Sequence, residues 1–94
     1  MQVDRKVIES SLVSKGFVRH DTHHKYFYHE IEGQRTGIHT YTSHGSKYKT
    51  YRDPLLGRMK RELRLDSLGQ VVDLCRCPIT GDGYNEILRK KGQI

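Results

Sequence analysis

The most constraining feature of this sequence is a pair of extended segments, residues 24–31 and 36–42, joined through Glu32-Gly33-Gln34. The first segment alternates its side chains with the period of a β-strand, and the second returns as another strand. Gly33 supplies the positive φ that a tight hairpin turn requires. Residues 17–20 form a short strand ahead of both, so the sequence predicts a three-stranded antiparallel meander.

Alternation along residues 24–31 divides the side chains between two faces. One face carries Lys25, Phe27, His29 and Ile31, and the other carries His24, Tyr26, Tyr28 and Glu30. Because each face contains aromatic rings, the period alone does not decide which one is buried. We expect Phe27 and Ile31 to point into the core, which leaves Tyr26 and Tyr28 on an open face.

Amphipathic helices are predicted on both sides of the meander. Residues 4–15 place apolar side chains at helical spacing, with Asp4 as the N-cap and Gly16 at the C-terminal end. Asp53 followed by Pro54 predicts another helix start, because aspartate caps free amides and proline fits the first turn. The apolar stripe of that helix is Leu55, Leu56, Met59 and Leu63.

Residues 43–51 are polar, basic and without a period, so they predict a loop. Two further helices are predicted near the C-terminus, at residues 67–75 and 80–91, with Pro78 between them. The fold class is therefore α+β: an α-β-β-β-α unit with a three-stranded antiparallel sheet, plus a C-terminal helical extension.

The length of 94 residues suits a single hydrophobic core. Residues 1–65 are expected to form the α-β-β-β-α domain, and residues 66–94 a helical extension packed on the same domain. Cys75 and Cys77 are separated by one residue, which makes a mutual disulfide awkward. We expect both thiols to be reduced, half-buried helix residues.

The mean hydropathy of −0.78 describes a polar chain. No apolar run approaches the roughly 18 residues that a membrane-spanning helix needs, and the N-terminus lacks the apolar stretch of a signal peptide. We therefore expect a cytoplasmic location and no membrane partner.

Positive charge is concentrated in one part of the chain. The whole chain carries +6, and between residues 44 and 64 seven basic side chains face only Asp53 and Glu62, a net +5. The basic residues are Lys47, Lys49, Arg52, Arg58, Lys60, Arg61 and Arg64. Such a segment is typical of a polyanion binder, although a solvated helix face has the same composition.

Four of the six histidines fall between residues 20 and 29. A metal site would use His20, His23, His24 and His29, but no cysteine pair or H-E-x-x-H helix supports one, and we expect no metal and no other cofactor. Alternatively, these histidines form the polar rim of a half-exposed sheet.

A catalytic interpretation centres on His23, which lies where a hairpin enters its central strand. Imidazole exchanges protons near neutral pH, and the hydroxyl of Thr22 could orient either the ring or a phosphate. RNA carries its own nucleophile, the 2′-hydroxyl, so one histidine and a few cations are enough for a ribonuclease.

Several short motifs together resemble the HicA (YcfA-like) toxin family. They are Gly16-Phe17-Val18, Thr22-His23-His24-Lys25-Tyr26, His44-Gly45 and the helix ending near residue 65. The resemblance covers about residues 5–65. It implies a double-stranded-RNA-binding-like α-β-β-β-α fold, metal-independent endonuclease activity on mRNA, and a HicB-like antitoxin as protein partner.

The resemblance also implies roles for individual residues. His23 corresponds to the family's catalytic histidine, and Thr22 takes the place of the serine before it. The implied RNA-binding residues are His24, Lys47, Lys49, Arg58 and Arg61. Asp21 stands where the family has glycine, which places a negative charge beside His23. The extension, residues 66–94, has no counterpart in the family, and one role open to it is to mediate a homodimer.

Two other functions remain open from sequence. One is a non-catalytic RNA-binding module whose basic segment contacts phosphates. The other is a protein-interaction domain on the same scaffold, for which Tyr26, Tyr28 and Tyr41 would supply the aromatic anchor.

Overall fold

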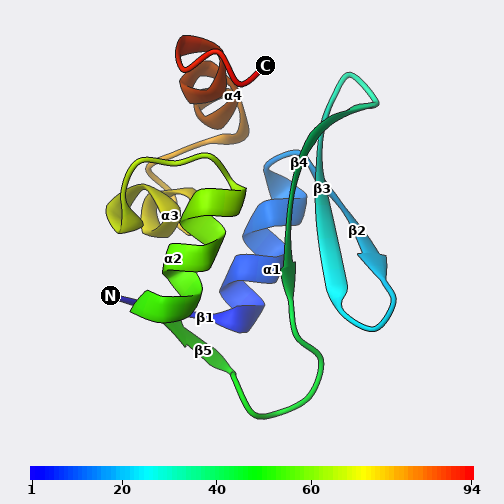
Figure 1. The fold of residues 1–94 in the computed structure, drawn as a ribbon, viewed down its shortest axis with the longest axis vertical. Helices are drawn as coiled ribbons and strands as arrows, with labels where there is room; N and C mark the ends of the chain where they lie inside the picture. The colour runs from blue at the N-terminus through cyan, green and yellow to red at the C-terminus, as the bar shows by residue number, and fades with distance from the viewer.

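The computed structural model describes all 94 residues as four helices and five strands (Figure 1). The elements in chain order are β1 (Gln2–Asp4), α1 (Arg5–Ser14), β2 (Phe17–Asp21), β3 (Lys25–Ile31), β4 (Gln34–Thr42), β5 (Thr50–Arg52), α2 (Asp53–Glu62), α3 (Leu68–Cys75) and α4 (Gly81–Lys90). The fold is α+β, as the sequence predicts, and α1, the three strands of the meander and α2 follow in the predicted order. Two short strands are added to that order, β1 before α1 and β5 between β4 and α2, and two helices follow it.

The main sheet is an antiparallel meander in which β3 lies between β2 and β4. Ile31 pairs with Gln34, and the two residues between them, Glu32 and Gly33, have φ of 51° and 78°. This is the predicted tight hairpin, with positive φ at both turn residues. Phe27 points into the core as expected, whereas Ile31 is half-buried at the end of its strand.

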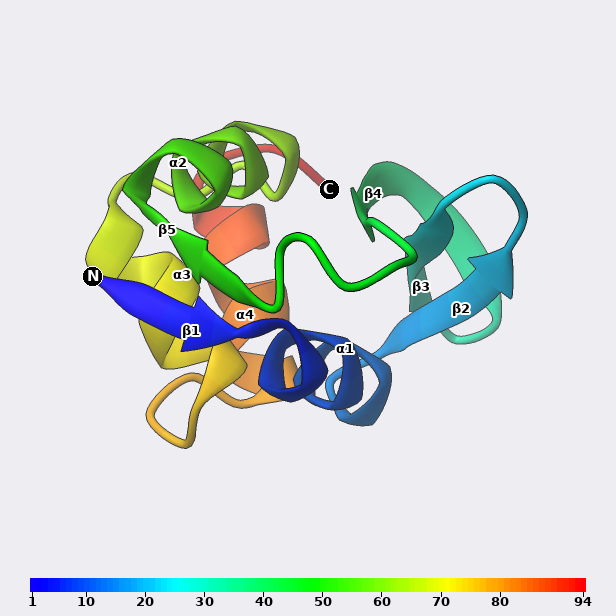
Figure 2. The same cartoon turned by 90° about the horizontal axis from the view of Figure 1, so that it is seen from below.

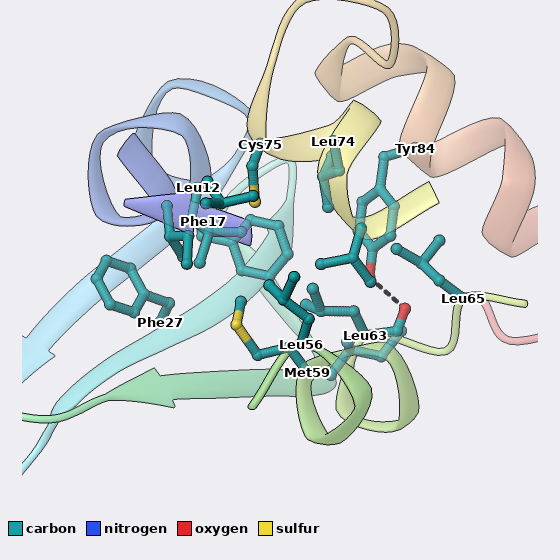
Figure 3. Close-up of a cluster of buried hydrophobic side chains, with 14 of the residues drawn as sticks. Leu12, Phe17, Phe27, Leu56, Met59, Leu63, Leu65, Leu74, Cys75 and Tyr84 are labelled. Carbon is teal, nitrogen blue, oxygen red and sulfur yellow. Dashed lines mark hydrogen bonds between the residues drawn. The ribbon is translucent and has the colours of Figure 1, made fainter. Parts of the chain in front are cut away.

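All four helices lie on one side of this sheet, which leaves the other side without a covering element (Figures 1 and 2). α1 packs against β2 and α2 against β4. Figure 3 shows the core between them, where apolar side chains of the sheet meet those of all four helices. The fully buried members include Phe27, Leu12, Leu56, Leu74 and Leu88. Burial of one such side chain contributes about 1.5–3 kcal/mol.

The C-terminal extension is joined to the rest of the molecule by polar contacts as well as apolar ones. The ammonium of Lys15, just after α1, donates to the carbonyl oxygens of Leu74 and Arg76 at the end of α3. The hydroxyl of Tyr84 in α4 donates to the carbonyl of Leu63 at 2.7 Å (Figure 3). Burial raises the pKa of that hydroxyl well above its usual value. Residues 66–94 therefore share one core with the preceding domain.

The prediction that residues 43–51 are entirely loop is wrong at its C-terminal end. Thr50 and Tyr51 belong to β5, which pairs antiparallel with β1 to form a second, two-stranded sheet. Val3 and Tyr51 are register partners and both are buried. Three-residue strands show no measurable period, so only the pairing of distant segments defines them.

Neither of the two aspartates predicted as N-caps caps its helix through its side chain. Asp4 occupies the cap position of α1 but makes no capping bond, because its carboxylate accepts from Thr50 Oγ1 at 3.1 Å. Asp53 is the first helical residue of α2 and accepts from the N-terminal amine at 2.9 Å. By contrast, Ser67 and Thr80 do cap α3 and α4 through their side-chain oxygens.

Two smaller expectations also differ from the structure. His24 is expected as the first residue of a strand, but it lies in the turn before β3. Cys75 is fully buried at the end of α3, and burial raises the pKa of its thiol to about 11. Cys77 is exposed and lies beyond the helix, so the two thiols are not the half-buried pair that the sequence predicts.

Candidate functional site

The turn between β2 and β3 holds the candidate catalytic residues. Thr22, His23 and His24 connect the two strands, and the Thr22 amide donates to the His24 carbonyl at 2.8 Å. Thr22 and His23 are exposed, whereas His24 is half-buried. The turn therefore presents the two predicted catalytic side chains at one end of the sheet.

His23 is held in place by a tyrosine of the open face. Its Nε2 lies 3.1 Å from the hydroxyl of Tyr26, and the two rings meet edge to face with centroids 5.6 Å apart. The direction of this bond depends on the tautomer: when the hydroxyl donates, the ring proton resides on Nδ1, and when Nε2 donates to the hydroxyl oxygen, Nδ1 is left unprotonated. This contact orients an otherwise exposed imidazole, and no pattern in the sequence predicts it.

His24 is packed rather than free. Its ring stacks on Tyr41 at a centroid distance of 4.8 Å and an angle of 25°, and it also contacts the ring of His23 at 4.8 Å. Its Nδ1 is buried without a hydrogen-bond partner. The structure therefore places this predicted RNA-binding residue beneath the site, where it supports His23.

A second histidine reaches the same turn from the loop that follows β4. His44 Nε2 lies 3.0 Å from the carbonyl oxygen of Thr22, so this nitrogen donates. The loop is fixed on either side of His44: the Ser43 amide donates to the Tyr51 hydroxyl at 3.1 Å, and Arg5 donates to the Gly45 carbonyl at 2.6 Å. In Figure 1 this loop leaves β4 at the same end of the sheet as the β2–β3 turn.

The negative charge of Asp21 is compensated locally. Arg19 makes two parallel hydrogen bonds to its carboxylate, at 2.7 and 2.8 Å. These bonds hold the pKa of Asp21 below its usual value and raise that of Arg19. An approaching phosphate therefore meets an ion pair beside His23 rather than an isolated carboxylate.

The open face of the sheet carries a continuous layer of rings. Tyr26 lies 5.8 Å from its cross-strand partner Tyr41 and 6.2 Å from Tyr28, measured between ring centroids. Tyr28 in turn contacts His39 at 5.6 Å and His20 at 5.7 Å. These separations are typical of aromatic pairs, so the rings of the open face are held by contacts with one another rather than by a covering helix.

Two arginines lie over this aromatic layer. The guanidinium carbon of Arg58 is 3.8 Å from the Tyr41 ring centroid, and that of Arg35 is 4.0 Å from the Tyr28 centroid. Arg58 is also bound to Glu62 at 2.7 Å and to the Tyr41 carbonyl at 3.0 Å. The guanidinium of Arg58, a predicted RNA-binding residue, is therefore already bound to other protein groups. Arg35 is exposed, and it is not among the predicted RNA-binding residues.

The remaining predicted RNA-binding residues occupy two separate places. Lys47 and Lys49 are exposed and line an open pocket of about 590 Å³ together with Arg52. Arg61 is exposed and lines a different groove, of about 290 Å³, between α2 and β4. Lys47 and Lys49 therefore lie on the loop that carries His44, whereas Arg61 lies apart from them.

His29 is separated from the other histidines of the metal hypothesis. It is fully buried on the opposite face, where its Nε2 lies 2.8 Å from Asn85 Oδ1 and its Nδ1 lies 2.9 Å from Thr36 Oγ1. Burial lowers its pKa from the usual value. The chain contains no group of three or more histidine, cysteine or carboxylate side chains arranged to bind a metal ion.

The comparisons with known proteins give no further guidance. No family model, no curated protein and no solved structure matches this chain. None of its four helices combines the length and the apolar character needed to cross a bilayer. The basis for a functional conclusion is therefore the geometry of the site itself.

Proposed function

We propose that this protein acts on RNA as a metal-independent endoribonuclease of the HicA type, with His23 as its general acid and base. The observation that carries the proposal is the His23–Tyr26 contact of 3.1 Å at an exposed turn. When Nε2 donates to the Tyr26 hydroxyl oxygen, the ring is held in one orientation and Nδ1 is free to accept a proton, as a general base must do. The neighbouring loop adds His44, Lys47 and Lys49, which supply hydrogen-bond donors and positive charge.

The chemistry uses the 2′-hydroxyl of RNA as the nucleophile. Nδ1 of His23 removes its proton, the 2′-oxygen forms a bond to phosphorus, and the bond from phosphorus to the 5′-oxygen breaks. The departing 5′-oxygen takes a proton from the His23 imidazolium, which returns to its neutral form, and the products end in a 2′,3′-cyclic phosphate and a 5′-hydroxyl. Because the nucleophile belongs to the substrate, the reaction has no need of a metal-activated water.

The decisive experiment is incubation of the purified protein with a labelled RNA of mixed sequence in EDTA. Wild-type protein is expected to cleave, and both His23→Ala and His23→Gln to lose about 10²- to 10⁴-fold in rate. The glutamine variant retains a group that can bond to Tyr26 but cannot transfer a proton near neutral pH. Unchanged melting temperatures of both variants would show that the fold survives.

Three outcomes would contradict the proposal. They are cleavage that EDTA abolishes, a variant that cleaves at the wild-type rate, and products without cyclic phosphate. As a matched substrate control, the same sequence made as DNA lacks the 2′-hydroxyl and is expected to stay intact. Cleavage of RNA is also expected to vary between pH 5 and 8, where imidazoles titrate.

A second candidate is a non-catalytic RNA-binding module, favoured by the aromatic and basic surface that extends beyond His23. It predicts intact RNA in every lane together with binding that weakens steeply with salt, because each phosphate contact releases counterions. Under the leading proposal, a HicB-like antitoxin is the expected protein partner. Protection of RNA from cleavage by such a protein would test that part.

A further inference from the structure

A cluster on the open face, made of His20, Tyr28, Arg35 and His39, has no part in the proposed proton transfer. Tyr28 is its centre: Arg35 lies over the ring at 4.0 Å, while His39 stacks at 5.6 Å and His20 contacts it edge to face at 5.7 Å. Arg35 also lies 3.3 Å from His20 Nε2. All members except the half-buried Tyr28 are exposed.

The cluster continues into the groove between β4 and α2. His39 belongs to both, and the other residues lining this groove are Gly37, Arg61, Glu62 and Arg64. The carboxylate of Glu62 is already engaged, because it accepts from Arg58 at 2.7 Å and from Thr40 at 2.7 Å. Arg61 and Arg64 are exposed. The groove therefore offers positive charge directly beside exposed rings.

This combination fits a nucleic acid whose bases are unpaired. Aromatic rings and flat guanidinium groups both stack on bases, and neighbouring arginines neutralise the phosphates that link them. A duplex keeps its base faces inside the helix, so it has nothing to place against Tyr28, His39 or Arg35. Glu30 is the register partner of Arg35 on this face.

We propose that this cluster stacks unpaired bases of a single-stranded RNA whose phosphates lie along Arg61 and Arg64. The inference rests on the proposed function, because it concerns the same RNA that His23 would cleave. Tyr28 is two residues along β3 from Tyr26, which holds His23, and a strand advances roughly 3.3 Å per residue. The stacked bases are thus within a few nucleotides of the scissile bond.

The test is a binding measurement in the His23→Ala background, where the RNA stays intact. Fluorescence anisotropy compares a short unstructured oligoribonucleotide with the same strand annealed to its complement. We expect the single strand to bind about tenfold or more tightly than the duplex. Tyr28→Ala is expected to weaken single-strand binding roughly 5- to 100-fold, whereas Tyr28→Phe, which keeps the ring, is expected to bind as the parent does.

Two further variants protect the test against a folding artefact. His39→Ala removes an exposed ring and is expected to weaken single-strand binding without changing the melting temperature. Arg61→Ala is expected to reduce the slope of log affinity against log salt by about 1. Its matched control is Arg89→Ala, which removes the same charge from the exposed surface of α4 and is expected to leave that slope unchanged.

Several results would overturn the inference. Equal or tighter binding of the duplex would do so, as would single-strand affinity unaffected by Tyr28→Ala and His39→Ala. Failure to bind either the single strand or the duplex would also contradict it, because the open face would then not bind RNA. The cleavage assay is read separately: if RNA is cut but Tyr28 is irrelevant to binding, the nuclease proposal stands and the stacking site is wrong. If binding depends on Tyr28 but no RNA is cut, the stacking site stands and the nuclease proposal is wrong.

Discussion

The two faces of the β2–β3–β4 sheet are built from the same strands but stabilised in different ways. On the inner face, Phe27, Ile38 and His29 are buried beneath helices. On the outer face, Tyr26, Tyr28 and Tyr41 are half-exposed and contact one another, histidines and two arginines. A strand that alternates can thus carry a buried apolar face and a half-exposed aromatic face at once.

The polar groups of the inner face show why the helices are necessary. Thr40 donates to Glu62 of α2 at 2.7 Å, and Thr42 donates to Glu9 of α1 at 2.6 Å. A buried polar group without a partner costs about 1–3 kcal/mol, so each of these bonds depends on a helix being in place. The outer face needs no such cover, because its rings and cations remain in contact with water.

The largest expected difference between the faces is in stability. Phe27→Ala is expected to lower the free energy of unfolding by about 3–5 kcal/mol, because it leaves a cavity in the core. Tyr28→Ala, one residue further along β3, is expected to cost about 1 kcal/mol or less, the worth of a cross-strand pair. Urea denaturation of both variants measures the contrast. Equal losses would mean that the outer face is also covered in solution.

A smaller effect is expected at Glu9, the buried carboxylate that joins α1 to the sheet. Its oxygens accept from Thr42 at 2.6 Å and lie 3.3 Å from the ammonium of Lys25. Glu9→Gln keeps the shape but removes the charge opposite Lys25, and is expected to cost about 1–3 kcal/mol. Glu86→Gln, an exposed residue of α4, is the matched control and is expected to change stability by less than about 0.5 kcal/mol.

Acidification is expected to weaken the inner face through His29. Burial lowers the pKa of the native imidazole below its unfolded value of about 6.5, so the unfolded chain binds a proton that the native protein does not. The contribution of His29 is complete above that value and is lost as the pH falls, by at most about 1.4 kcal/mol per pH unit. Melting temperatures between pH 7 and 5 measure it. A His29→Gln protein with the same pH dependence as the wild type would contradict this assignment.

The smallest effect concerns the outer face and the cleavage reaction. Tyr26→Phe keeps the ring but removes the hydroxyl that lies 3.1 Å from His23. We expect cleavage to slow by about 2- to 10-fold, the worth of one hydrogen bond, with a shifted pH profile and an unchanged melting temperature. Tyr28→Phe is the matched control, and an equal loss there would mean that the Tyr26 hydroxyl does not position His23.

Much of the architecture could be predicted from local signals. Gly33 and the alternation around Phe27 identify the hairpin, and Ser67 and Thr80 mark real helix starts. The short β1–β5 sheet could not be found in this way, because it is defined by pairing between the N-terminus and residues 50–52. For the same reason Asp4 and Asp53 look like caps in sequence, but their carboxylates bind partners from distant segments.

The candidate site also combines features that follow from local sequence with features that depend on contacts between distant segments. The sequence by itself determined that residues 22–26 carry hydroxyl, imidazole and phenol groups at the entrance to a strand, because alternation and turn chemistry are local. Only the tertiary structure decided that His44 reaches Thr22, that Arg58 is engaged by Glu62 and Tyr41, and that His29 is buried while His23 is exposed. These outcomes depend on which helix covers which face, and that is settled by packing between segments far apart in the chain.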